Sequence, residues 1–174
     1  MYNLVVRRDI MRFYMKQKVF SWGEKFTIKD EQGNDCYYVE GEVFSMGHKL
    51  HIYDAQSREV AYIRQKVFSF RPRFFISMEG TSEELELVQR FTFFKQEYYI
   101  ENSSYLLEGN FSAHNFILKS NEGVAMSVDK EWFTWGDSYV IDIRDSADAL
   151  MCICIMLAVD CANADAAQTA SSST

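Results

Sequence analysis

Along most of the chain, hydrophobic and polar positions follow a unit of about nine residues that recurs every 20 to 24 residues. Each copy reads Phe, Ser or Thr, usually a second aromatic residue, a short turn, and then a large apolar residue, any residue, and Ile or Leu. The copies begin at six phenylalanines: Phe20, Phe44, Phe68, Phe91, Phe111 and Phe133. A fixed period in this range indicates one structural unit that is repeated.

Within a copy, residues two apart share a chemical type, which is the pattern of strands with one buried face. Phe20 and Trp22 have the parity of one strand, and Phe26 and Ile28 have the parity of the next. A glycine, which tolerates the positive φ of a tight hairpin, stands between the two halves in three copies: Gly23, Gly47 and Gly136. Each copy therefore predicts a strand, a tight turn and a second strand.

Polar clusters separate the copies and predict the remaining chain reversals. These clusters lie at 30–35, 54–57, 79–81, 102–104 and 120–123. Six copies with two strands each predict about twelve antiparallel strands in meander order. An open sheet of that width tends to curl or split, and closing it removes the exposed edges. The pattern therefore predicts a mostly β protein whose strands form a closed barrel.

The end of the chain has a different pattern, because residues 150–159 contain no polar side chain. Asp145 or Ser146 is a suitable N-cap, and Asp148 places negative charge in the first turn. These signals predict one helix over about 146–168. A helix that is apolar on every side must be enclosed, and a barrel of about twelve strands has room for one helix. The apolar run is only ten residues long, whereas a membrane span needs about 20, so we expect a buried central helix.

Length and composition suit one domain, with 174 residues of which 48% are hydrophobic and 16% aromatic. We expect the domain to cover 11–168, with residues 1–10 as a leader outside the fold and 169–174 as a flexible tail. The first twenty residues lack the apolar run of a signal peptide, and the four cysteines suit a reduced protein. These features predict a cytoplasmic location.

Four segments resemble the LURP-one-related / YxjI-like family. Residues 11–26, 39–47 and 63–72 each contain Val-Phe-Ser, and 132–139 contains Phe-Thr-Trp-Gly. The hydrophobic helix that ends at Asp160 is also similar, so the resemblance covers about 11–165. It implies a tubby C-terminal-like fold, a twelve-stranded barrel around a central C-terminal helix, in a superfamily that also holds the phospholipid scramblases. It implies no catalytic residues.

Motifs of known enzymes are missing: the chain has no G-x-G-x-x-G, P-loop, G-x-S-x-G or H-E-x-x-H. His48, His51 and His114 fall in or beside predicted turns, where we expect solvated side chains. A metal site of His48, His51 and Asp54 is an open alternative, although odd spacings place strand residues on opposite faces. Cys36 is expected to be a structural free thiol. Three clustered acids are expected on a solvated strand face: Glu83, Glu84 and Glu86. We therefore predict no catalytic residue, metal or cofactor.

Charge is distributed unevenly along a chain whose net charge is −7. Residues 1–18 hold five basic residues and one acid, and residues 64–73 hold four basic residues and no acid, so each segment carries +4 and the remainder −15. Six of these cations make up the candidate anion-binding site: Lys16, Lys18, Arg64, Lys66, Arg71 and Arg73. Lys18 has the same parity as Phe20, so we expect these cations near a rim of the barrel or beside a bulge that shifts the register.

A basic patch on an acidic protein favours an anionic ligand, and the phosphoinositide binding of tubby proteins points by analogy to a lipid headgroup. The first hypothesis is a non-enzymatic binding or regulatory module that is cytoplasmic or peripheral to a membrane. Its partner is an anionic phospholipid or phosphoinositide headgroup, or an unknown protein. The alternatives are a scramblase-like lipid-translocating protein and an enzyme of unrecognised type. Nucleic acid is not expected, because the −15 on the remaining surface repels phosphate.

Overall fold

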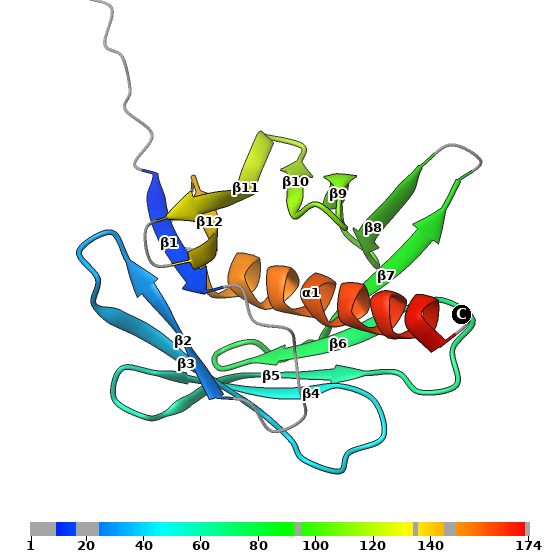
Figure 1. The fold of residues 1–174 in the computed structure, drawn as a ribbon, viewed down its shortest axis with the longest axis horizontal. Helices are drawn as coiled ribbons and strands as arrows, with labels where there is room; N and C mark the ends of the chain where they lie inside the picture. Colours follow the sequence, from blue (N-terminus) through cyan, green and yellow to red (C-terminus); the bar gives the residue numbers. More distant parts are fainter. Residues whose placement is uncertain (1–9, 17–24, 93–94, 134–135, 145–148, 173–174) are drawn as a thin grey trace, which may run out of the picture.

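The structure is a computed structural model that describes residues 10–16, 25–92, 95–133, 136–144 and 149–172. Twelve antiparallel strands in these ranges close into a barrel in which each strand pairs with its neighbours in the chain and β1 pairs with β12 (Figure 1). The strands are β1 (Met11–Lys16), β2 (Lys25–Asp30), β3 (Asp35–Gly41), β4 (Lys49–Asp54), β5 (Glu59–Gln65), β6 (Arg73–Met78), β7 (Leu85–Phe91), β8 (Gln96–Ile100), β9 (Leu106–Asn110), β10 (Asn115–Ser120), β11 (Gly123–Phe133) and β12 (Gly136–Ile143). The predicted twelve-stranded meander barrel is confirmed.

The helix α1 (Ala149–Ser172) runs through the barrel (Figure 1) and packs against β5, β6, β11 and β12. Every side chain from Cys152 to Cys161 is buried, so the predicted central helix is confirmed. It extends four residues past the predicted end at 168, and residues 169–172 are helical where a flexible tail was expected. Thr169 and Ser171 help to continue the last turns by donating hydrogen bonds to the carbonyls of Asp165 and Gln168.

Several predicted features lie outside the described residues. They are the leader apart from Ile10, the N-cap at Asp145 or Ser146, Lys18, and the first half of the copy that begins at Phe20. The side chains at the start of the copy beginning at Phe133 are likewise outside the described set.

The second half of each copy forms the wall of the core. The isoleucines that end five copies are all buried: Ile28, Ile52, Ile76, Ile100 and Ile141. Two residues before them, Leu50, Phe74, Tyr98 and Tyr139 are buried as well. Because side chains two apart on a strand share a face, these pairs point inward onto α1, as the alternation predicted.

In the copies that begin at Phe44, Phe68 and Phe111, the first half does not form a strand, which corrects the sequence prediction for these copies. The strand β3 ends at Gly41 and β5 ends at Gln65, so Phe44 and Phe68 fall in the connections that follow. Both have positive φ, 63° and 57°, and their side chains are almost fully exposed. The connection around Gly47 is therefore a projecting loop rather than the predicted tight turn.

In a meander barrel, alternate connections lie at the same end. We call one end the aromatic rim, which has the connections 42–48, 66–72 and 111–114 and the two described residues, 92 and 95, between β7 and β8. We call the other end the polar rim, with connections 31–34, 55–58, 79–84, 101–105 and 121–122. The strand β12 delivers the chain to α1 at the polar rim, so the C-terminal half of α1 lies at the aromatic rim (Figure 1).

Candidate functional site

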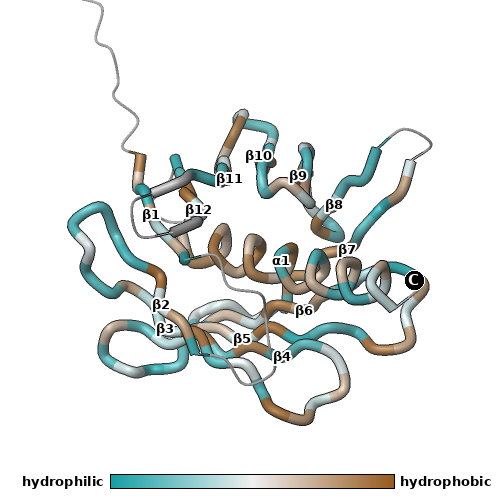
Figure 2. Tube along the Cα trace, viewed as in Figure 1, coloured by the Kyte–Doolittle hydropathy of each residue, from teal (hydrophilic) through white to brown (hydrophobic). Residues whose placement is uncertain are grey.

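Exposed apolar side chains gather at the aromatic rim. Eight large hydrophobic residues are exposed in the described part of the chain, and seven of them belong to this rim: Val43, Phe44, Met46, Val67, Phe68, Phe70 and Phe91. Phe44 is 98% exposed and Phe68 is 92% exposed. Figure 2 shows the hydrophobic colour on the β3–β4 and β5–β6 connections. Such a concentration of exposed apolar side chains is typical of an interaction surface.

Two of these phenylalanines hold an unfavourable backbone conformation. Phe44 and Phe68 stand at equivalent positions of neighbouring copies, 24 residues apart, and both lie in the left-handed region. A bulky residue there is a genuine outlier and costs about 1–3 kcal/mol. Strain repeated at equivalent positions makes these two residues candidates for a functional role.

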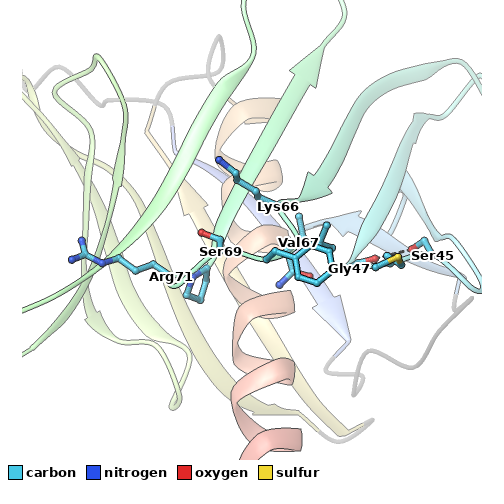
Figure 3. A pocket seen from close by; sticks show the side chains of 10 residues that line it. Ser45, Gly47, Lys66, Val67, Ser69 and Arg71 are labelled. Carbon is cyan, nitrogen blue, oxygen red and sulfur yellow. Dashed lines mark hydrogen bonds between the residues drawn. The ribbon is translucent and has the colours of Figure 1, made fainter.

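A hollow of about 420 Å³ is lined by residues of the β3–β4 and β5–β6 connections. Gly47 (φ 76°) permits the close approach of the two connections, because a Cβ there would lie only 2.9 Å from Cγ1 of Val67. In Figure 3, Lys66 and Arg71 extend away from the hollow in different directions. The hollow is therefore not a convergent anion pocket, and the cations flank the exposed phenylalanines instead.

The helix fixes the bases of both connections through Asp165. Its carboxylate lies 2.8 Å from Nε2 of His48 and accepts a hydrogen bond of 2.7 Å from Nε2 of Gln65. The backbone N–H of His48 donates to Oε1 of Gln65 over 2.8 Å. Burial raises the pKa of Asp165, but the hydrogen bonds from His48 and Gln65 outweigh it and leave that pKa below its usual value.

A second contact joins the helix to the β9–β10 connection. The carboxylate of Asp160 lies 2.7 Å from Nε2 of His114, whose ring stacks on Tyr139 with 4.2 Å between ring centroids. Asn163 donates to the carbonyl of Phe111. Burial raises the pKa of Asp160, and His114 opposes that rise.

The histidines correct the prediction of solvated turn residues. The side chains of His48 and His114 are only 13% and 12% exposed, because each faces a carboxylate of α1. His51 lies on the outer wall between Glu42 and Glu59. Over the described ranges, no group of three or more His, Cys, Asp or Glu side chains is placed to hold a metal ion. No local signal reveals these contacts, since the partners are 46 and 117 residues apart.

The six predicted cations separate into different environments. Arg64 pairs with Glu84 at 2.8 Å and lies over the ring of Phe75. Arg73 pairs with Glu86. Glu84 and Glu86 thus pair with two candidate cations. Glu83 and Glu84 are exposed, as predicted, but they lie in the connection before β7 rather than on a strand. The side chains of three cations have no acidic partner among the residues that the structure describes: Lys16, Lys66 and Arg71.

The points at which the strands end explain how a lysine can share the parity of a phenylalanine of the repeat and still be exposed. The strand β5 ends at Gln65, so Lys66 is the first residue of a connection and obeys no strand parity. Lys16 is the last residue of β1 and is exposed at the same end of the barrel. The expectation that the cations lie near a rim is therefore correct for these two residues.

Comparison with known proteins decides the family. The family model described as LURP-one-related matches residues 11–160. The chain belongs to the LURP-one-related family. It is 34% identical over 151 residues to the uncharacterized protein YxjI of Bacillus subtilis (strain 168), covering 87% of this chain and 93% of that protein. The predicted resemblance is confirmed.

The fold is also similar to a crystal structure of a protein from Arabidopsis thaliana. The TM-score is 0.57 at 14% identity, and the alignment covers 87% of this chain and 91% of the other. At that identity the likeness concerns the fold alone. It agrees with the barrel and central helix of this LURP-one-related chain.

The central helix passes a further test that bears on the scramblase-like alternative. By length and composition, Ala149–Ser172 is apolar enough to cross a membrane, so the short apolar run does not by itself exclude a span. Two thirds of its most apolar stretch is buried inside the barrel, as in the core helix of many proteins. In this LURP-one-related chain the helix therefore serves as core.

Proposed function

We propose that this LURP-one-related chain is a non-enzymatic module that binds anionic lipid headgroups at the cytoplasmic surface of a membrane. The observation that carries the proposal is the β5–β6 connection. It holds Lys66 and Arg71, which have no acidic partner among the described residues, beside the exposed Phe68 and Phe70.

Electrostatics favours this connection over the rest of the surface. Near an anionic membrane each Lys or Arg contributes roughly 1 kcal/mol of attraction, provided that no carboxylate neutralises it. Arg64 and Arg73 are neutralised by Glu84 and Glu86. Of the six predicted cations, the proposed site therefore includes only Lys66 and Arg71, and Lys16 lies at the same rim.

Binding is favoured over catalysis by the way the barrel is filled. The side chains of Cys152–Cys161 occupy its interior, so a site must lie at a rim or on the outer wall. Two acids of the cluster formed by Glu83, Glu84 and Glu86 pair with arginines: Glu84 with Arg64, and Glu86 with Arg73. Paired carboxylates of that kind are structural, whereas a glycosidase needs two across a cleft.

The direct test is co-sedimentation with vesicles of phosphatidylcholine alone, with phosphatidylserine, and with a phosphoinositide. We expect binding to the anionic vesicles only, and its loss in Lys66→Glu/Arg71→Glu. A matched control is Arg58→Glu/Arg144→Glu, which changes the net charge equally at the polar end and is expected to keep binding. Absence of binding by the wild type to every vesicle would overturn the proposal and direct the search to a protein partner.

A further inference from the structure

We propose that the barrel docks end-on and inserts phenylalanines of the aromatic rim into the acyl boundary of an anionic bilayer. This inference rests on the proposed function and adds an apolar contribution to the free energy of membrane binding. The inserting residues are Phe44 of the β3–β4 connection, Phe68 and Phe70 of the β5–β6 connection, and Phe91 at the end of β7.

The positions of these residues suit a flat apolar phase. They come from three different copies of the repeat, yet all lie at one end of the barrel because alternate connections share an end. Phe44, Phe68 and Phe70 are each more than 90% exposed, and Phe91 is 61% exposed. Aromatic side chains with adjacent cations are the pattern found at membrane interfaces, where rings enter the apolar boundary and cations remain at the headgroups.

The loops that carry the exposed phenylalanines have little negative charge, although Asp165 of α1 and Glu131 near the end of β11 lie at the same end of the barrel. Glu42 pairs with Lys49 at 3.0 Å at the base of its connection. Beyond it, residues 43–48, 66–72, 92–95 and 111–114 contain no acid. The end of α1 from 166 to 172 contains no charged side chain. Desolvation of a carboxylate is therefore not required when these segments approach an anionic surface.

The backbone strain supports insertion rather than incidental exposure. Phe44 and Phe68 would each relax if glycine or asparagine replaced them, yet the outward-projecting conformation occurs at both equivalent positions. A protein partner would more readily fit one continuous apolar face. Here Phe44, Phe68 and Phe70 project from two different connections, with a hollow of about 420 Å³ beside Phe68, and fluid lipid chains adapt to such an uneven surface without a matching shape.

The experiment combines vesicle binding with insertion into anionic lipid monolayers. The test variant is Phe44→Ser/Phe68→Ser/Phe70→Ser, and its control is the same triple substitution to Leu, which keeps the apolar character. Burial of three apolar side chains predicts that affinity for phosphatidylserine vesicles falls about tenfold or more in the Ser variant. The Leu variant should keep most of the affinity, and only the wild type and the Leu variant should raise monolayer pressure.

The outcomes separate this inference from the function beneath it. Equal binding by the wild type and the Ser variant, with loss only in Lys66→Glu/Arg71→Glu, would overturn insertion and leave headgroup binding intact. Failure of the wild type to bind any vesicle would overturn both. Circular dichroism melts of the Ser variant confirm that a loss of binding does not come from unfolding.

Discussion

The two ends of the barrel use the left-handed backbone conformation with opposite chemistry. At the polar rim, glycine or asparagine, which tolerate it, hold four of the five positive-φ positions, and serine holds the fifth: Gly33, Ser57, Gly80, Asn102 and Gly123. At the aromatic rim, the same conformation is held by Phe44, Phe68 and His114 as well as by Gly47. The polar rim thus mostly uses residues that suit its turns. At the aromatic rim Phe44 and Phe68 hold this conformation with exposed side chains, and His114 holds it while facing α1.

Local hydrogen bonds show the same difference. At the polar rim, Oδ1 of Asp30 accepts from the backbone N–H of Gln32 and Asn34, and Oδ1 of Asp54 accepts from Gln56 and Arg58. At the aromatic rim, the base of the β3–β4 connection depends on the distant Asp165. The β2–β3 and β4–β5 turns are thus held by their own residues. The aromatic rim also has local bonds, such as that from the N–H of Ala113 to Oδ1 of Asn110, but the base of its β3–β4 connection is held by the helix as well.

The largest effect is expected from a substitution in α1, the helix that runs between the two ends. Ile155 is fully buried inside the barrel, so Ile155→Asp places an unpaired charge there at a cost of several kcal/mol. We expect an insoluble or unfolded product. Ile155→Val is the control and should cost about 1 kcal/mol. A soluble Asp variant with an unchanged melting temperature would contradict the central position of the helix.

A substitution at the polar rim should affect stability without affecting binding. Asp54→Ala removes the acceptor of two backbone N–H groups and the partner of Arg58. We expect a lower melting temperature, with Asp54→Asn retaining more of the wild-type value because the amide oxygen still accepts. Vesicle binding should be unchanged, and a loss of binding here would erase the distinction between the two ends.

At the aromatic rim we expect a substitution that raises stability and weakens vesicle binding. Phe68→Gly relieves the strain at φ 57°, and after the entropy of glycine is subtracted it should raise the free energy of unfolding by about 0.5–1 kcal/mol. Phe70→Gly removes the same side chain at a position without positive φ and should give no such gain. Chemical denaturation measures both. Each variant should bind vesicles more weakly, as expected where function opposes stability.

The smallest expected effect concerns pH. The pKa of Asp165 is lower in the folded state than its usual 3.8, so its contribution to stability is fully present above that value and is lost as pH falls through the folded pKa. The difference in unfolding free energy between the wild type and Asp165→Asn should therefore shrink on acidification from pH 6 to about pH 3. A constant difference over that range would show that the charge of Asp165 has no role.

The fold could be predicted because its pattern is local. The pairs Phe74/Ile76 and Tyr98/Ile100 display the two-residue alternation of a buried strand face, and residues 150–159 cannot be solvated. The error came at Phe44 and Phe68, where an aromatic residue normally indicates a buried strand position. Their exposure is set by where strand pairing ends, after Gly41 and Gln65, and alternation alone does not mark that point.

The candidate site could be predicted only in part. Lys66 and Arg71 could be predicted from a run of cations that contains no acid. The same run includes Arg64 and Arg73, whose carboxylate partners lie in the connection before β7 and on β7 itself. Cross-strand register decides which charges are compensated, and one sequence does not reveal it. The contacts of His48 and His114 with α1 were missed for the same reason, since only the closed barrel brings them together.

The measurement that tests the central claim most directly is hydrogen–deuterium exchange in the presence and absence of anionic vesicles. Docking through the aromatic rim predicts slower exchange in residues 42–48 and 66–72, with no change in 55–58 or 79–84 at the polar rim. Protection of the polar rim, or of outer-wall strands in place of the aromatic connections, would contradict the account.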